Sequence, residues 1–266
     1  MSKSIDSHND ISFSILDFLK RDKLLLFLSL VFITAISWWY MFYLAGKMDH
    51  SSMQMDMMPQ MMKWGIIQFL LTFIMWFVMM IAMMVPSVTP AVFIFSNVYQ
   101  KRAQNEKPVV SSWIFLLGYL SIWLVFSFLA TLFQSLLINT ALLSPMMKST
   151  SNILGGIILI GCGLFQWSSI KYSCLKHCRS PLDFLMGEWR DGKSGAFIMG
   201  FRHGYYCLGC CWLLMLLLFI TGVMNLLWVA LIALFVLIEK VAPKGIWISR
   251  FTGVILVVAG IWVIFS

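Results

Sequence analysis

Residues 64–85 read WGIIQFLLTFIMWFVMMIAMMV, a run without a single charged side chain. An α-helix needs about 20 apolar residues to cross a bilayer, so this run predicts a membrane span. Similar runs recur along the chain, which is 61% hydrophobic and only 11% charged. Soluble domains carry about 25% charged residues. The sequence therefore predicts an all-α fold, a polytopic bundle of transmembrane helices.

The apolar runs predict about seven spans in one membrane domain (24–266) that follows a short cytoplasmic segment (1–23). The spans lie at about 24–45, 64–85, 113–138, 152–170, 203–221, 223–239 and 246–265. The two spans within 203–239 are short, so a shallow hairpin or a total of six spans is the alternative. The first run exceeds the 7–15 apolar residues typical of a signal peptide, which favours a retained anchor.

The basic residues predict the orientation of these spans. If the amino terminus is cytoplasmic, only Lys47, Lys63 and Lys148 lie in outer loops. The other sixteen, Lys171 and Lys240 among them, then lie at inner flanks and loops. This bias predicts a multi-pass protein of the cell membrane, with loop 46–63 outside and loop 171–202 inside. Topology explains the net charge of +8, so no nucleic-acid partner is needed.

A methionine-rich outer loop, 46–63, precedes the opening run. Seven of the residues from Lys47 to Lys63 are methionine, although a short polar loop has no core for them to fill. Thioether and imidazole ligands suit Cu(I) better than they suit Mg, Ca or Mn. The candidate ligands in this loop are Met48, His50, Met53, Met55, Met57 and Met58.

The opening run itself carries a methionine stripe. Met75, Met79 and Met83 are four residues apart and so lie on one helix face. Such a stripe can relay a soft monovalent ion, or it can simply pack the core, because methionine fills irregular gaps.

Pro86 and Pro90 follow the stripe, and Glu239 closes the sixth span. The prolines predict either a broken helix at membrane depth or a helix that ends at the inner interface. Glu239 either guides a cation or proton or forms a solvated ion pair with its lysine neighbours, and the interface position favours the ion pair.

Five of the six cysteines fall in two groups near the inner face. These groups and the neighbouring histidines comprise Cys174, His177, Cys178, His203, Cys207, Cys210 and Cys211. Cytoplasmic thiols are normally kept reduced, which disfavours disulfides. A Cu(I), zinc or iron–sulfur site, a redox dithiol and simple packing are the alternatives, and the clustering favours metal binding. Cys162 lies among small residues of the fourth span, where close helix packing is expected.

The chain resembles a bacterial and archaeal family of predicted metal-binding integral membrane proteins, a domain of unknown function. The shared elements are Met83-Met84-x-Pro86-x3-Pro90, Cys174-Leu175-x2-Cys178-Arg179-x-Pro181, Trp189-Arg190-x-Gly192-x2-Gly195-Ala196, Cys207-x-Gly209-Cys210-Cys211-Trp212, Gly222-x-Met224-Asn225-x2-Trp228 and Glu239-Lys240-x2-Pro243. They cover about residues 64–245. The resemblance implies a metal-binding membrane protein without a stated reaction. Separately, the methionine-rich loop is similar to Met/His segments of extracytoplasmic copper proteins.

These patterns predict a membrane protein that captures Cu(I) outside and passes it towards the inner cysteines. The alternatives are an accessory or assembly subunit of a membrane metalloenzyme and a membrane thiol oxidoreductase. The expected partners are the lipid bilayer and a metalloenzyme or metallochaperone. No Ser/His/Asp set and no phosphate-binding glycine-rich loop occurs, so the sequence favours a protein that is not an enzyme.

Overall fold

The computed structural model describes residues 23–47, 65–102, 108–139, 152–222, 225–242 and 245–265, and these residues form helices and short connections without strands. The all-α expectation is confirmed over the described residues. The loop ligands fall outside them and stay predictions: Met48, His50, Met53, Met55, Met57 and Met58.

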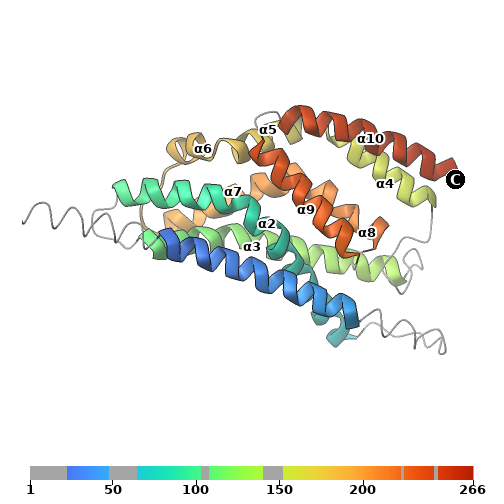
Figure 1. Ribbon diagram of the computed structural model, residues 1–266, viewed down its shortest axis with the longest axis horizontal. Helices are drawn as coiled ribbons and strands as arrows, with labels where there is room; N and C mark the ends of the chain where they lie inside the picture. The colour runs from blue at the N-terminus through green and yellow to red at the C-terminus, as the bar shows by residue number, and fades with distance from the viewer. Residues whose placement is uncertain are drawn as a thin grey trace, which may run out of the picture.

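The helices run roughly along the long axis of an elongated bundle (Figure 1). A first helix, Lys23–Lys47, is followed by α2 to α10. Their bounds are α2 Ile66–Arg102, α3 Pro108–Asn139, α4 Asn152–Phe165, α5 Ser169–Arg179, α6 Pro181–Gly187, α7 Gly192–Leu216, α8 Leu218–Thr221, α9 Leu226–Val241 and α10 Gly245–Phe265.

Four helices of the described chain are long and apolar enough to cross a membrane. They are Lys23–Lys47, α2, Ser111–Ile138 within α3, and α10. The other three predicted spans correspond to shorter or less apolar elements. Helix α4 ends at Phe165, α7 begins in polar sequence at Gly192, and α9 has 16 residues. The count of seven spans therefore stays a prediction.

Helix α2 continues without interruption through both prolines for 37 residues. The helix is therefore not broken at the prolines, nor does it end beside them, so neither expectation for this segment holds. Nearby hydroxyls bond to the backbone carbonyls of this turn: Ser87 Oγ donates to Met84 O at 2.9 Å and Thr89 Oγ1 donates to Val85 O at 2.8 Å. These carbonyls are not the ones that the prolines release, which are those of Ala82 and Pro86.

Glycine allows helices α4 and α10 to pack side by side (Figure 1). A Cβ atom added to Gly156 would lie 2.7 Å from the carbonyl oxygen of Gly260, and one added to Gly163 would lie 2.7 Å from that of Gly253. The close approach expected from the small residues of the fourth span is therefore present. Cys162 packs beside it, buried, with its thiol donating to Leu213 O at 2.9 Å.

Helices α3 and α7 approach even more closely, and this contact supports a stability prediction. A Cβ atom on Gly200 would lie 1.9 Å from the carbonyl oxygen of Phe115. We expect Gly200→Ala to lower the free energy of unfolding by about 1–3 kcal/mol, because two backbones must separate. Thermal unfolding in detergent measures the change. Gly161→Ala is the control, since nothing lies within 4 Å of its added Cβ. Equal midpoints for the two variants would contradict the prediction.

Candidate metal centre

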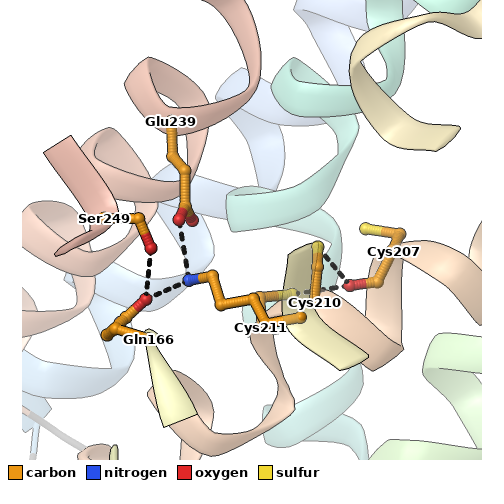
Figure 2. A network of polar contacts seen from close by, with 7 residues as sticks. Gln166, Cys207, Cys210, Cys211, Glu239 and Ser249 are labelled. Atoms are coloured by element: carbon orange, nitrogen blue, oxygen red, sulfur yellow. Dashed lines mark hydrogen bonds and ion pairs between the residues drawn. The ribbon is translucent and has the colours of Figure 1, made fainter. Parts of the chain in front are cut away.

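One stretch of α7 and the end of α5 bring four buried cysteines together. Cys207, Cys210 and Cys211 share one side of α7, because residues three and four apart lie on the same helix face. The thiols of Cys210 and Cys211 each donate to the carbonyl oxygen of Cys207 at 3.0 Å (Figure 2). Cys178 comes from the last turn of α5 and lies near enough to Cys207 and Cys210 for both thiols to influence its pKa.

The Cys178 thiol is held in its protonated form. Hydrogen bonds to Cys207 and Cys210, together with burial, raise the pKa of Cys178 well above its usual range. A metal ion that binds this sulfur must therefore displace a proton, as is general for thiolate ligands.

Cys174 lies at the edge of the four-cysteine group. Its sulfur rests on α7, where a Cβ atom added to Gly209 would lie only 2.7 Å from Cys174 Sγ. The glycine in the Cys207-x-Gly209-Cys210-Cys211 element therefore makes room for the second cysteine of α5. The half-buried Cys174 is the most exposed of the five clustered cysteines.

Cys207 has two further polar neighbours that sequence reasoning missed. Lys240 Nζ lies 2.8 Å from Cys207 Sγ and 3.0 Å from Ser87 Oγ, and the lysine side chain is buried. Tyr119 Oη lies 3.0 Å from the same sulfur. Helices α3 and α9 thus contact this sulfur of α7, and α2 joins the group through Ser87 and Lys240. Lys240 supplies a positive charge that favours a thiolate at this position.

Met84 borders the same group, although the sequence pointed to Met75, Met79 and Met83. The Met84 carbonyl accepts hydrogen bonds from Ser87 Oγ at 2.9 Å and from Tyr119 Oη at 3.5 Å, and Ser87 Oγ is 4.0 Å from Met84 Sδ. The three predicted methionines are buried in the core of the bundle. The available signal was the neighbouring helix face, on which Met84 lies one position after Met83.

The two candidate histidines differ in their surroundings. His203 is buried one turn before Cys207, its ring centroid lies 6.0 Å from that of Tyr119, and its Nδ1 has no hydrogen-bond partner among the described residues. His177 is bound to its own helix through Nδ1 and Ser173 O at 2.8 Å, and its ring stacks on Tyr206. His203 is therefore the better placed nitrogen ligand.

Glu239 is buried and not solvated, which corrects the expectation of an ion pair at the interface with neighbouring lysines. Its carboxylate lies 2.7 Å from Lys171 Nζ, and both side chains are only 1% exposed. Successive helix residues point about 100° apart. The Lys240 side chain therefore points towards Cys207, while the Glu239 side chain points towards Lys171 of α5. Figure 2 shows Glu239 on the opposite side of the view from Cys207.

The shared sequence elements converge on the ends of these helices. Arg179, next to Cys178, donates through Nη2 to the carbonyl oxygen of Ala242 at 2.7 Å, just after α9. A Cβ atom on Gly245 would lie 2.1 Å from the carbonyl oxygen of Glu239. The first contact fixes the end of α9 against α5 and the second fixes it against the start of α10, and together they position Lys240 and Glu239.

The four sulfurs are close together, but their present contacts are hydrogen bonds. Among the residues that the structure describes, no group of three or more His, Cys, Asp or Glu side chains is arranged as a ready metal site. The thiols of Cys210 and Cys211 are directed at a carbonyl, and Cys207 is bound to Lys240 and Tyr119. Thiolates with a nearby thioether are the donor set that Cu(I) prefers.

The described helices bring buried thiols together, and thiols are ligands that suit a soft metal ion. The chain belongs to the copper chaperone family PpoB2, which matches residues 73–263, well over half of its length. The match includes the methionine stripe and every cysteine but excludes the methionine-rich loop. No curated protein and no solved structure matches the chain. The predicted metal-handling class is thus confirmed at the level of copper.

Proposed function

We propose that this protein is a membrane copper chaperone that holds Cu(I) at the cysteine centre formed by Cys178, Cys207, Cys210 and Cys211. The observation that carries the proposal is the convergence of α5 and α7 on one buried group of sulfurs. Membership of a copper chaperone family supports the choice of metal. Met84 and His203 are the additional donors within reach of small rearrangements.

The proposed path runs from weak to strong ligands. The methionine-rich outer loop captures Cu(I), and the stripe Met75, Met79 and Met83 offers neutral thioethers inside the bundle. Thioethers release the ion readily, whereas thiolates hold it. The buried stripe belongs to α2, the same helix that carries Met84 to the edge of the cysteine centre. The loop is this chain's own collector, since the family match begins after it.

The proposal includes the topology expected from charge and hydropathy. The chain crosses the cell membrane about seven times, with its amino terminus in the cytoplasm, so the loop lies outside and the cysteine centre near the inner face. The apolar side chains exposed on the surface of α10, such as Trp262 at 71% and Phe265 at 86%, support contact with lipid.

The alternative role, an accessory or assembly subunit of a membrane metalloenzyme, is compatible with the proposed copper chaperone function. It describes that function less specifically. A chaperone delivers its metal, so a copper-requiring metalloprotein is the natural recipient. The thiol oxidoreductase alternative has less support, because Cys207 and Cys210 are each only 1% exposed and a protein disulfide does not reach them.

Copper content tests the proposal directly. The full chain is purified in detergent without oxygen, loaded with Cu(I), washed with a weak chelator and analysed for metals. We expect stoichiometric copper in the wild type and in a variant lacking residues 48–63, because the tight site lies elsewhere. We expect loss of the tightly held copper in the triple variant Cys207→Ser/Cys210→Ser/Cys211→Ser. Copper retention by the triple variant would overturn the proposal.

Vesicles distinguish transfer across the membrane from storage. Reconstituted protein should accumulate Cu(I) at a rate that falls in Met79→Leu and Met83→Leu, because leucine keeps the volume and removes the thioether. Stoichiometric binding without flux would reject transport and leave the chaperone role in place.

A further inference from the structure

The four cysteines of the proposed centre are too deeply buried to meet another protein. The three cysteines of α7 are at most 1% exposed, and Cys178 of α5 is also buried. Cu(I) prefers soft ligands, so a recipient must bring such a ligand to the ion before the donor releases it. The centre therefore needs a ligand at its edge that both the buried sulfurs and a recipient can reach. Two side chains of α5 have this position.

The first of them, Cys174, lies one helical turn before Cys178. Residues four apart share a helix face, with Cβ atoms about 5–6 Å apart. Cys174 Sγ packs against Gly209, the residue before Cys210. Burial and the nearby Cys210 thiol both raise the pKa of Cys174. Of the five clustered cysteines, Cys174 is nevertheless the one that is not fully buried, so it borders both the centre and the surface.

The second side chain, His177, lies three residues after Cys174 and has a fixed ring. Its Nδ1 lies 2.8 Å from Ser173 O, and a carbonyl oxygen can only accept, so the neutral ring carries its proton on Nδ1. The lone pair is therefore on Nε2. The ring stacks on Tyr206, with 4.2 Å between centroids and 5° between planes. A histidine that binds metal through one nitrogen usually donates the other N–H to such an acceptor.

The charge around this pair favours an anionic recipient. Helix α5 contains no acidic residue, and Lys176, between the two side chains in sequence, is exposed. A positive surface attracts anions, and a cysteine thiolate is an anion that suits Cu(I). We propose that Cys174 and His177 form an exchange site, through which Cu(I) passes from Cys178 to a recipient protein that presents a cysteine thiolate. This inference rests on the proposed function.

The exchange moves protons and no electrons. In the first step a bond from Cu(I) to Cys174 Sγ forms and the bond to Cys178 Sγ breaks, while Cys174 gives up a proton and Cys178 takes one up. His177 Nε2 holds the ion while its sulfur ligands change. In the second step the recipient's thiolate replaces Cys174, which takes up a proton from water. The ion remains Cu(I) throughout.

Transfer rate and equilibrium affinity together test the exchange site. The copper-loaded full chain in detergent is mixed without oxygen with a biotinylated peptide that carries two cysteines. The peptide is captured at successive times and its copper is measured. We expect transfer to be at least about tenfold slower in Cys174→Ser and in His177→Phe, whose ring can still stack on Tyr206. The Cu(I) affinity of both variants, measured with a coloured chelator, should stay within about threefold of the wild type, because the buried ligands are unchanged.

Cys162→Ser is the matched control for the rate. Its thiol donates to Leu213 O outside the cysteine centre, so transfer should keep the wild-type rate. A wild-type rate in Cys174→Ser or in His177→Phe would overturn the proposal, as would equal slowing in Cys162→Ser. A loss of affinity in Cys174→Ser as large as that in Cys207→Ser would also overturn it, because Cys174 would then belong to the centre itself. A wild-type chain that binds no Cu(I) would instead overturn the proposed function, and this inference with it.

Discussion

Cys207→Ser is expected to lower the Cu(I) affinity of the purified protein by about 100-fold or more, or about 2.8 kcal/mol. Cys207 has the most polar neighbours of the clustered cysteines: Lys240 Nζ lies 2.8 Å and Tyr119 Oη 3.0 Å from its sulfur. Cys178 is near enough for the two thiols to influence each other's pKa. Serine keeps the shape but substitutes a hard oxygen, which Cu(I) binds poorly. Anaerobic competition against a coloured Cu(I) chelator measures the affinity.

Cys162→Ser provides the matched control for this loss. Cys162 is equally buried, but its thiol donates to Leu213 O within the packed helices and has no place in the cysteine centre. Its Cu(I) affinity should remain within about threefold of the wild-type value, because no ligand is removed. An equal loss in both variants would indicate that the fold, and not a ligand, had been damaged. Wild-type affinity in Cys207→Ser would contradict the placement of the centre.

The cysteine groups were recognisable from sequence because ligand types and their spacing are local properties. Cys207, Cys210 and Cys211 lie within two turns of one helix, and their convergence requires only helical periodicity. The contact between Tyr119 and the backbone of Met84 is not a local property of this kind. Which of two adjacent methionines borders the centre depends on where Tyr119 of α3 approaches α2, and the sequence of α2 does not contain that information.

Hydropathy predicted the long helices well and their ends poorly. The run that ends at Val85 was expected to mark a span, but α2 extends to Arg102 because its prolines do not break it. Charge counting likewise treated Lys171 and Lys240 as interface markers. Both are buried in specific contacts, one with Glu239 and one with Cys207. A lysine that turns into the bundle has the same sequence signature as one that reaches the headgroups.

The buried pair of Lys171 and Glu239 leads to the second large expected effect, this time on folding. Glu239→Gln should lower the free energy of unfolding by about 3–5 kcal/mol, because it leaves an uncompensated ammonium charge in the bundle. The double variant Lys171→Met/Glu239→Gln should recover most of that loss, since the unpaired charge is then removed as well. Midpoints of denaturant unfolding in detergent for the wild type, both single variants and the double variant form the required cycle.

The chain contains its own control for the effect of burial on this interaction. Arg202 and Glu188 form an ion pair of similar length, 2.8 Å against 2.7 Å, but their side chains are 46% and 29% exposed where those of Lys171 and Glu239 are each 1% exposed. Glu188→Gln should therefore cost no more than about 1 kcal/mol, because water screens and solvates the remaining arginine. Both substitutions remove one carboxylate from an ion pair, but only Glu239→Gln leaves a buried charge. The difference between their losses of unfolding free energy therefore measures the effect of burial. The idea that Glu239 neutralises a buried Lys171 would be contradicted by equal losses of unfolding free energy at the two sites. A double variant as unstable as Glu239→Gln would contradict it as well. In that case Lys171 would not be the group that holds Glu239, and the end of α9 would be fixed by its other contacts, such as those of Arg179 with Ala242 and of Lys240 with Cys207.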